Sequence, residues 1–418
     1  MRLPGAGDTH LTYCTNIHPA NGWPAVFENL KRYAPPLKAR FSPGAPFGLG
    51  LRLSAREARE LLEQGPGELR RFLDDHGLYV AILNGFPHGA FHGTVVKADV
   101  YAPDWRDPAR VHYTMDLIEI LRQLLPEGVE GGISTAPLSY KPWMAASDSG
   151  GWDEITRNVT CVAAALAKVR AADGRMIHLD IEPEPDCSLE TSAETIEFFS
   201  RRLLPYGAPL LARELAVAED ASRAALLDHI QVCFDCCHFA VEYEDPTPAL
   251  DSLHAAGIKM GRVQLSSALK VPFPADRARC AEAAARLQAF ADPVYLHQVV
   301  EQGTPLRRFP DLGDALHNAG TACSREWRIH FHVPLFTSEY DGFESTQDYV
   351  RQVLHAVLRT NATRHLEIET YTWDVLPAGL KRDLDDSIAR EYDWVLNEIR
   401  TPDPPIPRSY RSPDRPGL

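Results

Sequence analysis

Eight short apolar or β-branched runs alternate with amphipathic stretches along this chain, and this alternation restricts the fold more than any other feature. The runs cover residues 11–17, 47–53, 78–84, 131–137, 176–182, 230–236, 259–265 and 366–371. Helices are expected between them, over 24–34, 54–76, 107–125, 152–172, 190–204, 219–228, 247–256, 275–290 and 345–359. Strands that alternate with helices indicate βαβ units and a parallel sheet. About eight such units favour a closed (β/α)8 TIM barrel over an open sheet.

The chain has no convincing linker within residues 1–400, so these residues are expected to form one barrel domain. Residues 291–336 do not fit the barrel pattern, and their runs 294–300 and 327–335 predict an insertion with extra strands before the last barrel strand. Residues 401–418 are rich in Pro, Arg, Ser and Asp, which predicts a disordered tail. No Gly-x-Gly-x-x-Gly turn follows a predicted strand, which disfavours a dinucleotide-binding fold.

Charge and composition restrict the partners. The formal net charge of −14 and the isoelectric point of about 5.6 disfavour nucleic acid, since a negative surface repels phosphate backbones. The first residues lack the apolar core of a signal peptide, and no run approaches the ~20 apolar residues that cross a bilayer. A cytoplasmic protein without membrane insertion is therefore expected. The eight cysteines are scattered, as is typical of reduced thiols. Cys233, Cys236 and Cys237 could bind zinc, but they lack a second ligand pair, which favours small core residues.

Ionisable residues follow the predicted strands at their carboxyl ends, where barrel enzymes place their sites. Glu182 ends one run, and Asp235 ends the next with His238 three residues later. Carboxylates inside a barrel are costly unless they are paired or bound to a metal. The alternative for Glu182 is that it caps a helix or orders a loop. We interpret these three residues as candidate metal ligands.

Three later segments extend this set. Gln264 could offer a neutral oxygen to a metal, bond a substrate, or serve as a core amide. His330 and His332 share one face of a predicted strand; such pairs commonly bind metals, although hydrogen-bonded core histidines are frequent. Glu367 and Glu369 share the lumen face of the last strand, with Glu369 nearer the mouth. Carboxylates and imidazoles together predict a divalent cation, namely Mn, Mg, Co, Zn or Fe.

Loops after the strand ends could line a polyol pocket, with ordinary loop packing as the alternative. The candidate substrate contacts are His18, Asn84, Phe86, His88, Trp143 and Tyr371. Lys141, next to Trp143, could meet an anionic group of a substrate.

Several of these segments resemble a known superfamily. Ile181-Glu182-Pro183, Asp235-Cys236-Cys237-His238 and Ile368-Glu369-Thr370 are similar to strand ends of xylose isomerase-like TIM barrels, which include ketose 3-epimerases, inosose dehydratases and nucleases of the endonuclease IV type. More closely, the segments 13–19, 47–54, 84–87 and 366–373 resemble the EboE family, over nearly the whole chain up to about residue 400. EboE proteins are described as metabolite-traffic proteins encoded in secondary-metabolite gene clusters.

The resemblance implies roles for individual residues. Glu182, Asp235 and Glu369 match metal-ligand positions of the superfamily, whereas Gln264 stands where a histidine ligand is usual. His238 and His332 match positions that bind extra zinc ions in the endonuclease branch, although its full histidine set is absent. Analogy with the superfamily also suggests a homodimer or a tetramer.

These residues predict a metal-dependent isomerase or epimerase that acts on a sugar or cyclitol through an enediolate, in secondary-metabolite biosynthesis or traffic. Glu182 and Glu369 would exchange the proton, and a dehydratase would use the same residues. The first alternative is a phosphoester hydrolase of the endonuclease IV type with two or three ions, in which His238, His330, His332 and either His88 or His92 would also bind metal. The second alternative is a metabolite-binding protein without catalysis.

Overall fold

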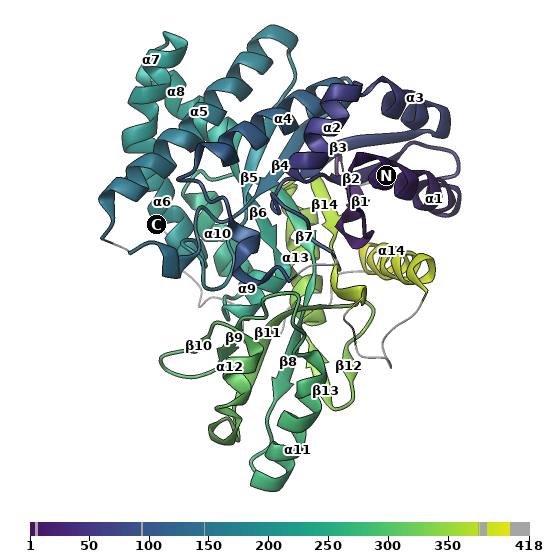
Figure 1. The fold of residues 1–418 in the computed structure, drawn as a ribbon, viewed down its shortest axis with the longest axis vertical. Coiled ribbons are helices and arrows are strands. Elements are labelled where there is room, and N and C mark those ends of the chain that lie inside the picture. The colour runs from purple at the N-terminus through teal and green to yellow at the C-terminus, as the bar shows by residue number, and fades with distance from the viewer. Residues whose placement is uncertain (5–6, 93–94, 146, 375, 377–382, 402–418) are drawn as a thin grey trace, which may run out of the picture.

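Eight parallel strands form the centre of the structure, a computed structural model that describes residues 1–4, 7–92, 95–145, 147–374, 376 and 383–401. The sheet order is β1-β14-β7-β6-β5-β4-β3-β2. The strands are β1 (His10–Tyr13), β2 (Phe47–Arg52), β3 (Leu78–Asn84), β4 (Gly131–Thr135), β5 (Ile177–Ile181), β6 (Ile230–Asp235), β7 (Met260–Leu265) and β14 (His365–Ile368). A parallel bridge between Cys14 and Gly50 joins the two ends of this order, so the sheet is nearly closed (Figure 1). The predicted (β/α)8 TIM barrel is confirmed.

A second, antiparallel sheet lies beside the barrel and is formed by the segment between β7 and β14 (Figure 1). Its strands are β8 (Ser267–Pro272), β9 (Val299–Glu301), β10 (Arg307–Phe309), β11 (Glu326–Val333), β12 (Glu339–Tyr340) and β13 (Phe343–Ser345). The insertion before the last strand is confirmed, but its sheet covers 267–345, a longer segment than the expected 291–336. The sequence hides this boundary because only Ser266 separates β7 from β8.

Helices surround the barrel and join its strands (Figure 1). They are α1 (Trp23–Phe41), α2 (Ala55–Gln64), α3 (Gly67–His76), α4 (Pro108–Leu124), α5 (Ser149–Asp173), α6 (Ser192–Phe198), α7 (Ala208–Leu215), α8 (Glu219–His229), α9 (Cys236–Val241), α10 (Pro246–Ala255), α13 (Gln347–Thr360) and α14 (Leu384–Arg400), with a π-helix at Phe199–Gly207. The insertion adds α11 (Arg277–Leu287) and α12 (Leu312–Leu316). The predicted helix 275–290 therefore belongs to the insertion.

Local chemistry explains where several helices begin and end. The Ser54 side chain and the Glu57 side chain each accept a hydrogen bond from the other's backbone N–H, and this capping box starts α2. The predicted helix 54–76 is two helices, because Gly65 has a φ of 78° and Pro66 lacks an N–H. At β6, the Asp235 carboxylate caps the following helix α9.

Charged residues fill the barrel lumen below its mouth. The fully buried Arg262 guanidinium donates to Asp180 at 3.1 Å and to Glu367 at 3.1 Å. Asp180 also bonds the His178 imidazole. A buried ion pair is stable only when its remaining hydrogen bonds are made, and Arg262 also donates to the Leu83 carbonyl at 3.1 Å. This layer lies directly beneath the strand ends that carry the candidate ligands.

Glycine leaves the space that this layer needs. A Cβ atom on Gly261 would lie 1.8 Å from Asp180 Oδ1 and 2.7 Å from His178 Nδ1. We predict that Gly261→Ala lowers the free energy of unfolding by about 2 kcal/mol or more, because the buried Asp180–His178 pair must move. Urea unfolding followed by circular dichroism measures this change. Gly44→Ala, where a Cβ meets nothing within 4 Å, should alter it by less than about 0.5 kcal/mol. Equal stability of the two variants would contradict this explanation.

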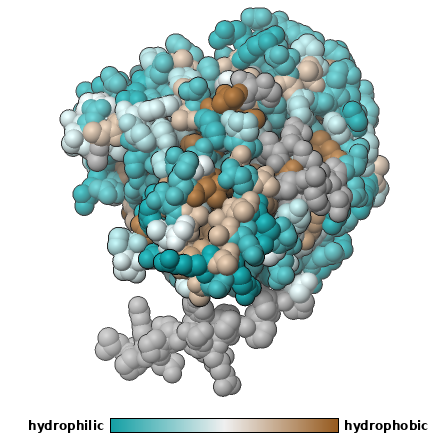
Figure 2. All heavy atoms as spheres, turned by 60° about the horizontal axis from the view of Figure 1, so that its bottom comes forward, coloured by the Kyte–Doolittle hydropathy of each residue, from teal (hydrophilic) through white to brown (hydrophobic). Residues whose placement is uncertain are grey.

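The surface offers less to interpret than the barrel mouth. On the face shown in Figure 2, small apolar areas are separated by hydrophilic residues. Within the described ranges, no helix is both long and apolar enough to cross a membrane. The predicted disordered tail lies outside the described residues, except for Thr401. The single domain over 1–400, the cytoplasmic location and the oligomeric state stay predictions.

Candidate metal centre

Four of the predicted ligands come together at the carboxyl ends of neighbouring strands. Glu182 directly follows β5, Asp235 ends β6, Gln264 lies in β7, and Glu369 directly follows β14. The strand order β5-β6-β7-β14 makes them neighbours, and Asp235 is paired in register with Gln264. All four are buried, and carboxylate oxygens of Glu182, Asp235 and Glu369 lie within 4.8 Å of one another. The structure thus brings together the residues that the sequence singled out.

Each of the three carboxylates, when ionised, makes ionisation of the other two less favourable. Burial and, next, a neighbouring carboxylate hold the pKa of Glu182 and the pKa of Glu369 well above the usual range. Burial also raises the pKa of Asp235, but His238, His332 and a hydrogen bond from Ser266 outweigh it and lower that pKa overall. A divalent cation would favour all three ionised forms.

Gln264 completes this group with a neutral amide. With its nitrogen turned toward the carboxylates, the amide donates to Glu182 Oε1 at 2.8 Å and to Asp235 Oδ2 at 3.0 Å. With its oxygen turned the same way, the amide would offer a neutral ligand to a cation between these groups. The two orientations fit the metal-free and the metal-bound site respectively.

Three histidines lie next to the carboxylates. His238 comes from α9, and His330 and His332 come from β11 of the insertion. Their Nδ1 atoms lie at 2.9 Å from the Pro183 carbonyl, 2.7 Å from Gln298 Oε1 and 2.8 Å from the Glu369 carbonyl, respectively. Because these oxygens can only accept, each Nδ1 carries the proton. In the neutral imidazoles, each Nε2 is then a lone pair available to a cation.

The Nε2 atoms face acidic partners and each other, and His330 Nε2 also lies 3.4 Å from the Tyr371 hydroxyl. His238 Nε2 lies 3.1 Å from His330 Nε2. Ligand atoms of Asp235, His238 and His332 lie within 4.8 Å of one another, as do those of Glu184, His238 and His330. Two lone pairs at 3.1 Å repel unless a proton or a cation lies between them, so this group fits a second cation.

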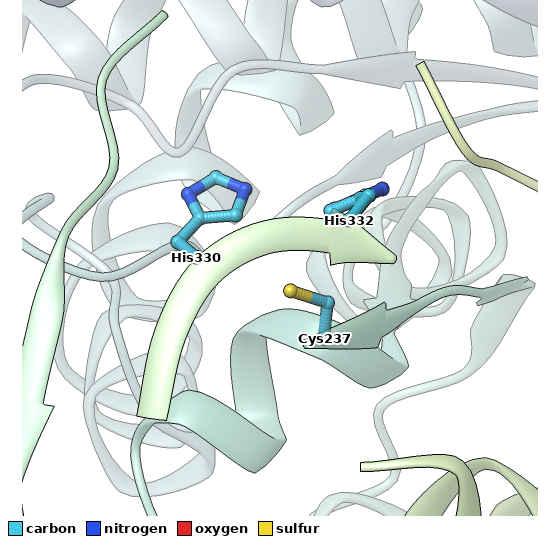
Figure 3. Close-up of side chains that lie close together, drawn as sticks. All are labelled: Cys237, His330 and His332. Atoms are coloured by element: carbon cyan, nitrogen blue, oxygen red, sulfur yellow. The ribbon is translucent and has the colours of Figure 1, made fainter. Parts of the chain in front are cut away.

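Cys237 lies beside the same histidines. Figure 3 shows its thiol on α9 near the imidazoles of His330 and His332 on β11. Burial holds the pKa of this thiol well above the ordinary value, and the same holds for Cys233 and Cys236. All three cysteines are fully buried, as expected for core residues, and the ligand atoms of Cys237, His330 and His332 also lie within 4.8 Å of one another.

The site also contains residues that the sequence analysis did not select. Glu184 is buried; its Oε1 accepts from the Tyr101 hydroxyl at 2.6 Å and from Gln298 Nε2 at 3.4 Å. Asn16 Nδ2 donates to Glu369 Oε1 at 2.8 Å. Glu184 and Asn16 both follow strand ends and could have been found by that criterion. Gln298 precedes a strand of the insertion, where the barrel pattern gives no signal.

A cavity of about 60 Å3 opens above the carboxylates. Glu182, Glu184 and Glu369 line it together with the predicted contacts Asn84, Phe86 and Tyr371.

Three of the predicted substrate contacts lie away from this cavity. His18 is buried against Tyr33, with ring centres 4.1 Å apart, and bonds the Tyr13 hydroxyl. His88 packs against a neighbouring tyrosine, and Trp143 is 37% exposed. Their positions after strand ends predicted that they would line the cavity. None of the three belongs to its described lining, so the geometry does not support a substrate role. The predicted anion contact Lys141 instead pairs with Glu190 at 2.7 Å.

The residues present fit a divalent cation. Among the described residues, Glu182 Oε2 and His332 Nε2 are buried atoms without a hydrogen-bond partner. They are a carboxylate oxygen and an imidazole nitrogen, which are ligands for Mg, Mn, Zn and Fe ions. Buried polar atoms are normally bonded, so two unbonded ligand atoms in one site favour a missing partner.

Comparisons with known proteins concern the fold. No family model matches the chain, and no curated protein matches it either. Solved structures do match. A xylose isomerase-like TIM barrel protein from Mycobacterium smegmatis in complex with magnesium is 12% identical over 95% of this chain and 98% of its own, with a TM-score of 0.49. The IOLI protein with a zinc atom is 11% identical over 94% and 98%, with a TM-score of 0.46. The probable 3-DHS dehydratase AsbF from Bacillus anthracis is 13% identical over 93% and 99%, with a TM-score of 0.44.

Membership of the EboE family is not confirmed by these comparisons. Likenesses at 11–13% identity assign no substrate or reaction to this chain.

The segment that carries Glu369 is anchored by a buried acid. Glu391 of α14 accepts hydrogen bonds from Thr370 Oγ1 at 2.6 Å and from the Leu335 N–H at 3.1 Å. Burial raises the pKa of Glu391 to about 7. In an unfolded chain the value is about 4.3, so folding favours the protonated acid. Its contribution to stability is complete below about pH 4.3 and is lost as the pH rises through about 7.

We predict that Glu391→Gln removes this pH dependence. Between pH 5 and pH 8 the wild type should lose about 3 kcal/mol of unfolding free energy relative to the variant, whose amide is always neutral. Urea unfolding of both proteins at several pH values measures the difference. Glu119→Gln, on the exposed side of α4, serves as the control. Parallel stability curves for the wild type and Glu391→Gln would show that Glu391 is ionised in the folded protein.

Proposed function

We propose that the protein is a divalent-metal-dependent isomerase or epimerase of a sugar or cyclitol. The observation that supports it is the group of three buried carboxylates, Glu182, Asp235 and Glu369, with the Gln264 amide beside them at the floor of a cavity. These four residues would hold the cation. Such a cation supplies Lewis-acid chemistry, which polarises a carbonyl group and offsets the charge of an enediolate.

Two of the carboxylates would also move the proton. Glu182 and Glu369 approach the cavity from strands on different sides of Gln264, so one would take a proton from carbon and the other return it. Asn16 donates to Glu369 Oε1 at 2.8 Å and would fix the orientation of that carboxylate. Loss of a hydroxyl group instead of reprotonation would make the enzyme a dehydratase with the same residues.

Several finer predictions belong to this proposal. Asn84, Phe86 and Tyr371 would contact the substrate, since they line the cavity. Membership of the EboE family, a role in secondary metabolism and a cytoplasmic location are proposed from the sequence resemblance and composition.

Elemental analysis of the purified protein tests the proposal. We expect at least one Mn, Mg, Co, Fe or Zn ion per chain in the wild type. Its affinity should fall at least about tenfold in Glu182→Gln and in Glu369→Gln, because each change removes a charged ligand. Glu301→Gln is the matched control, since Glu301 is also buried but lies in the insertion sheet. A wild type that takes up no metal under any loading condition would leave a metabolite-binding protein as the better account.

A phosphoester hydrolase is a second candidate, which the histidine group favours. His238, His330 and His332 present three Nε2 lone pairs beside Asp235 and Glu184, which would suit a second cation. Two ions close together commonly clamp a phosphate during hydrolysis. We predict that His332→Ala removes this second ion and leaves the first. Two ions per chain in the wild type, with hydrolysis of a phosphoester, would support this candidate; a single ion in both proteins would contradict it.

A further inference from the structure

We infer that this site accepts an uncharged or aminated polyol and excludes phosphate esters and carboxylates. The inference rests on the proposed isomerase or epimerase function and is incompatible with the second candidate, the phosphoester hydrolase; it concerns the charge of the ligand. It draws on the described residues at and around the cavity above the carboxylates, and on where each nearby positive group points.

Negative groups dominate the cavity. Glu182, Glu184 and Glu369 line it, and Asp235 lies directly behind them. One divalent cation would leave an excess of two negative charges, and two such cations would only balance the four carboxylates. With either number of ions the site has no positive excess. Like charges brought together in a buried site repel strongly, so an anionic ligand is disfavoured.

The lysine and arginine side chains near the cavity are paired elsewhere or lie outside its described lining. Lys97, the one lysine or arginine of the described lining, donates to Asp311 Oδ2 at 2.6 Å and to the Asp292 carbonyl at 3.1 Å. Arg110 is buried outside this lining; its Nη1 donates to the Phe86 carbonyl at 2.8 Å, whereas its Nη2 has no hydrogen-bond partner among the described residues. Arg262 lies beneath the site and is held by two carboxylates. A phosphate-binding site normally presents arginine or lysine to its ligand.

The helix that starts directly from β6 at the mouth offers no anion site either. A helix N-terminus commonly binds phosphate through its free N–H groups. At α9, the helix that starts from β6, the N–H groups of Cys237 and His238 donate to Asp235 at 2.8 Å and 3.1 Å. The Asp235 carboxylate therefore already occupies the position that a phosphate would take.

The walls favour a cation. Phe91, Tyr295 and Tyr371 line the cavity and contact one another with ring centres 5.0–5.3 Å apart. Aromatic faces attract ammonium groups. Glu184 lines the cavity outside the group of Glu182, Asp235 and Glu369, so a single cation in that group would leave its carboxylate unbound by metal; its Oε1 already accepts from Tyr101 and Gln298. We therefore assign the recognition of a substrate amine to Glu184.

Equilibrium binding to the magnesium-loaded protein tests the inference. The probes are matched sets on two skeletons: myo-inositol, its monoamine and its monophosphate, and glucose, glucosamine, gluconate and glucose 6-phosphate. We expect the amine or the neutral compound to bind at least about tenfold more tightly than the anion of the same skeleton. Glu184→Gln should weaken amine binding at least threefold and leave neutral compounds unchanged, whereas Glu301→Gln should alter neither. An anion that binds as tightly as its neutral parent would overturn the inference.

If neither the inositol compounds nor the glucose compounds bind, simple ions provide the test. Methylammonium, which has N–H groups to donate to Glu184, should then protect the loaded protein against thermal unfolding, and this protection should be lost in Glu184→Gln. Protection by inorganic phosphate, lost in Glu369→Gln, or no protection by the ammonium ion would overturn the inference. The relative affinities of the ligands are measured without turnover. Absence of isomerase activity would therefore refute the proposed function and not this charge preference.

Discussion

Three carboxylates buried within 4.8 Å of one another are the constraint on which the rest of the site depends. Their mutual repulsion in a dry barrel must be offset by protons or by a cation. Arg262 does not serve this purpose, because its guanidinium is shared by Asp180 and Glu367 one layer below. Arg262 thus partly neutralises the lumen, and the mouth keeps an acidic group whose repulsion a divalent cation would reduce.

The insertion determines what this acidic group can bind. His330 and His332 come from β11, and Tyr295 comes from the segment before β9, so the second sheet completes the mouth of the barrel. The barrel strands supply negative ligands, whereas the insertion supplies neutral imidazoles and an aromatic wall. A shorter insertion would leave the carboxylates open to solvent and would remove the group suited to a second cation.

The sequence predicted the barrel and the carboxylates because both follow a simple period. All eight barrel strands overlap predicted runs, and Glu182, Asp235 and Glu369 stand at their carboxyl ends. The start of the insertion could not be predicted, because β8 follows β7 after one residue and reads as a continuation of it. Loop contacts were predicted less well: Asn84 and Phe86 reach the cavity, whereas His18 faces Tyr33. The direction of a loop side chain depends on tertiary packing. Unlike the side chains of a strand or a helix, loop side chains follow no periodic pattern that could be recognised in a single sequence.

Diffraction from a crystal grown with manganese tests the central claim most directly. An anomalous difference map locates the ion without any assumption about substrate or reaction. The account predicts a peak bound by Glu182, Asp235, Gln264 and Glu369, with the amide oxygen of Gln264 facing it. A map without a peak among these four residues, in a protein whose carboxylates keep the positions described above, would contradict the account.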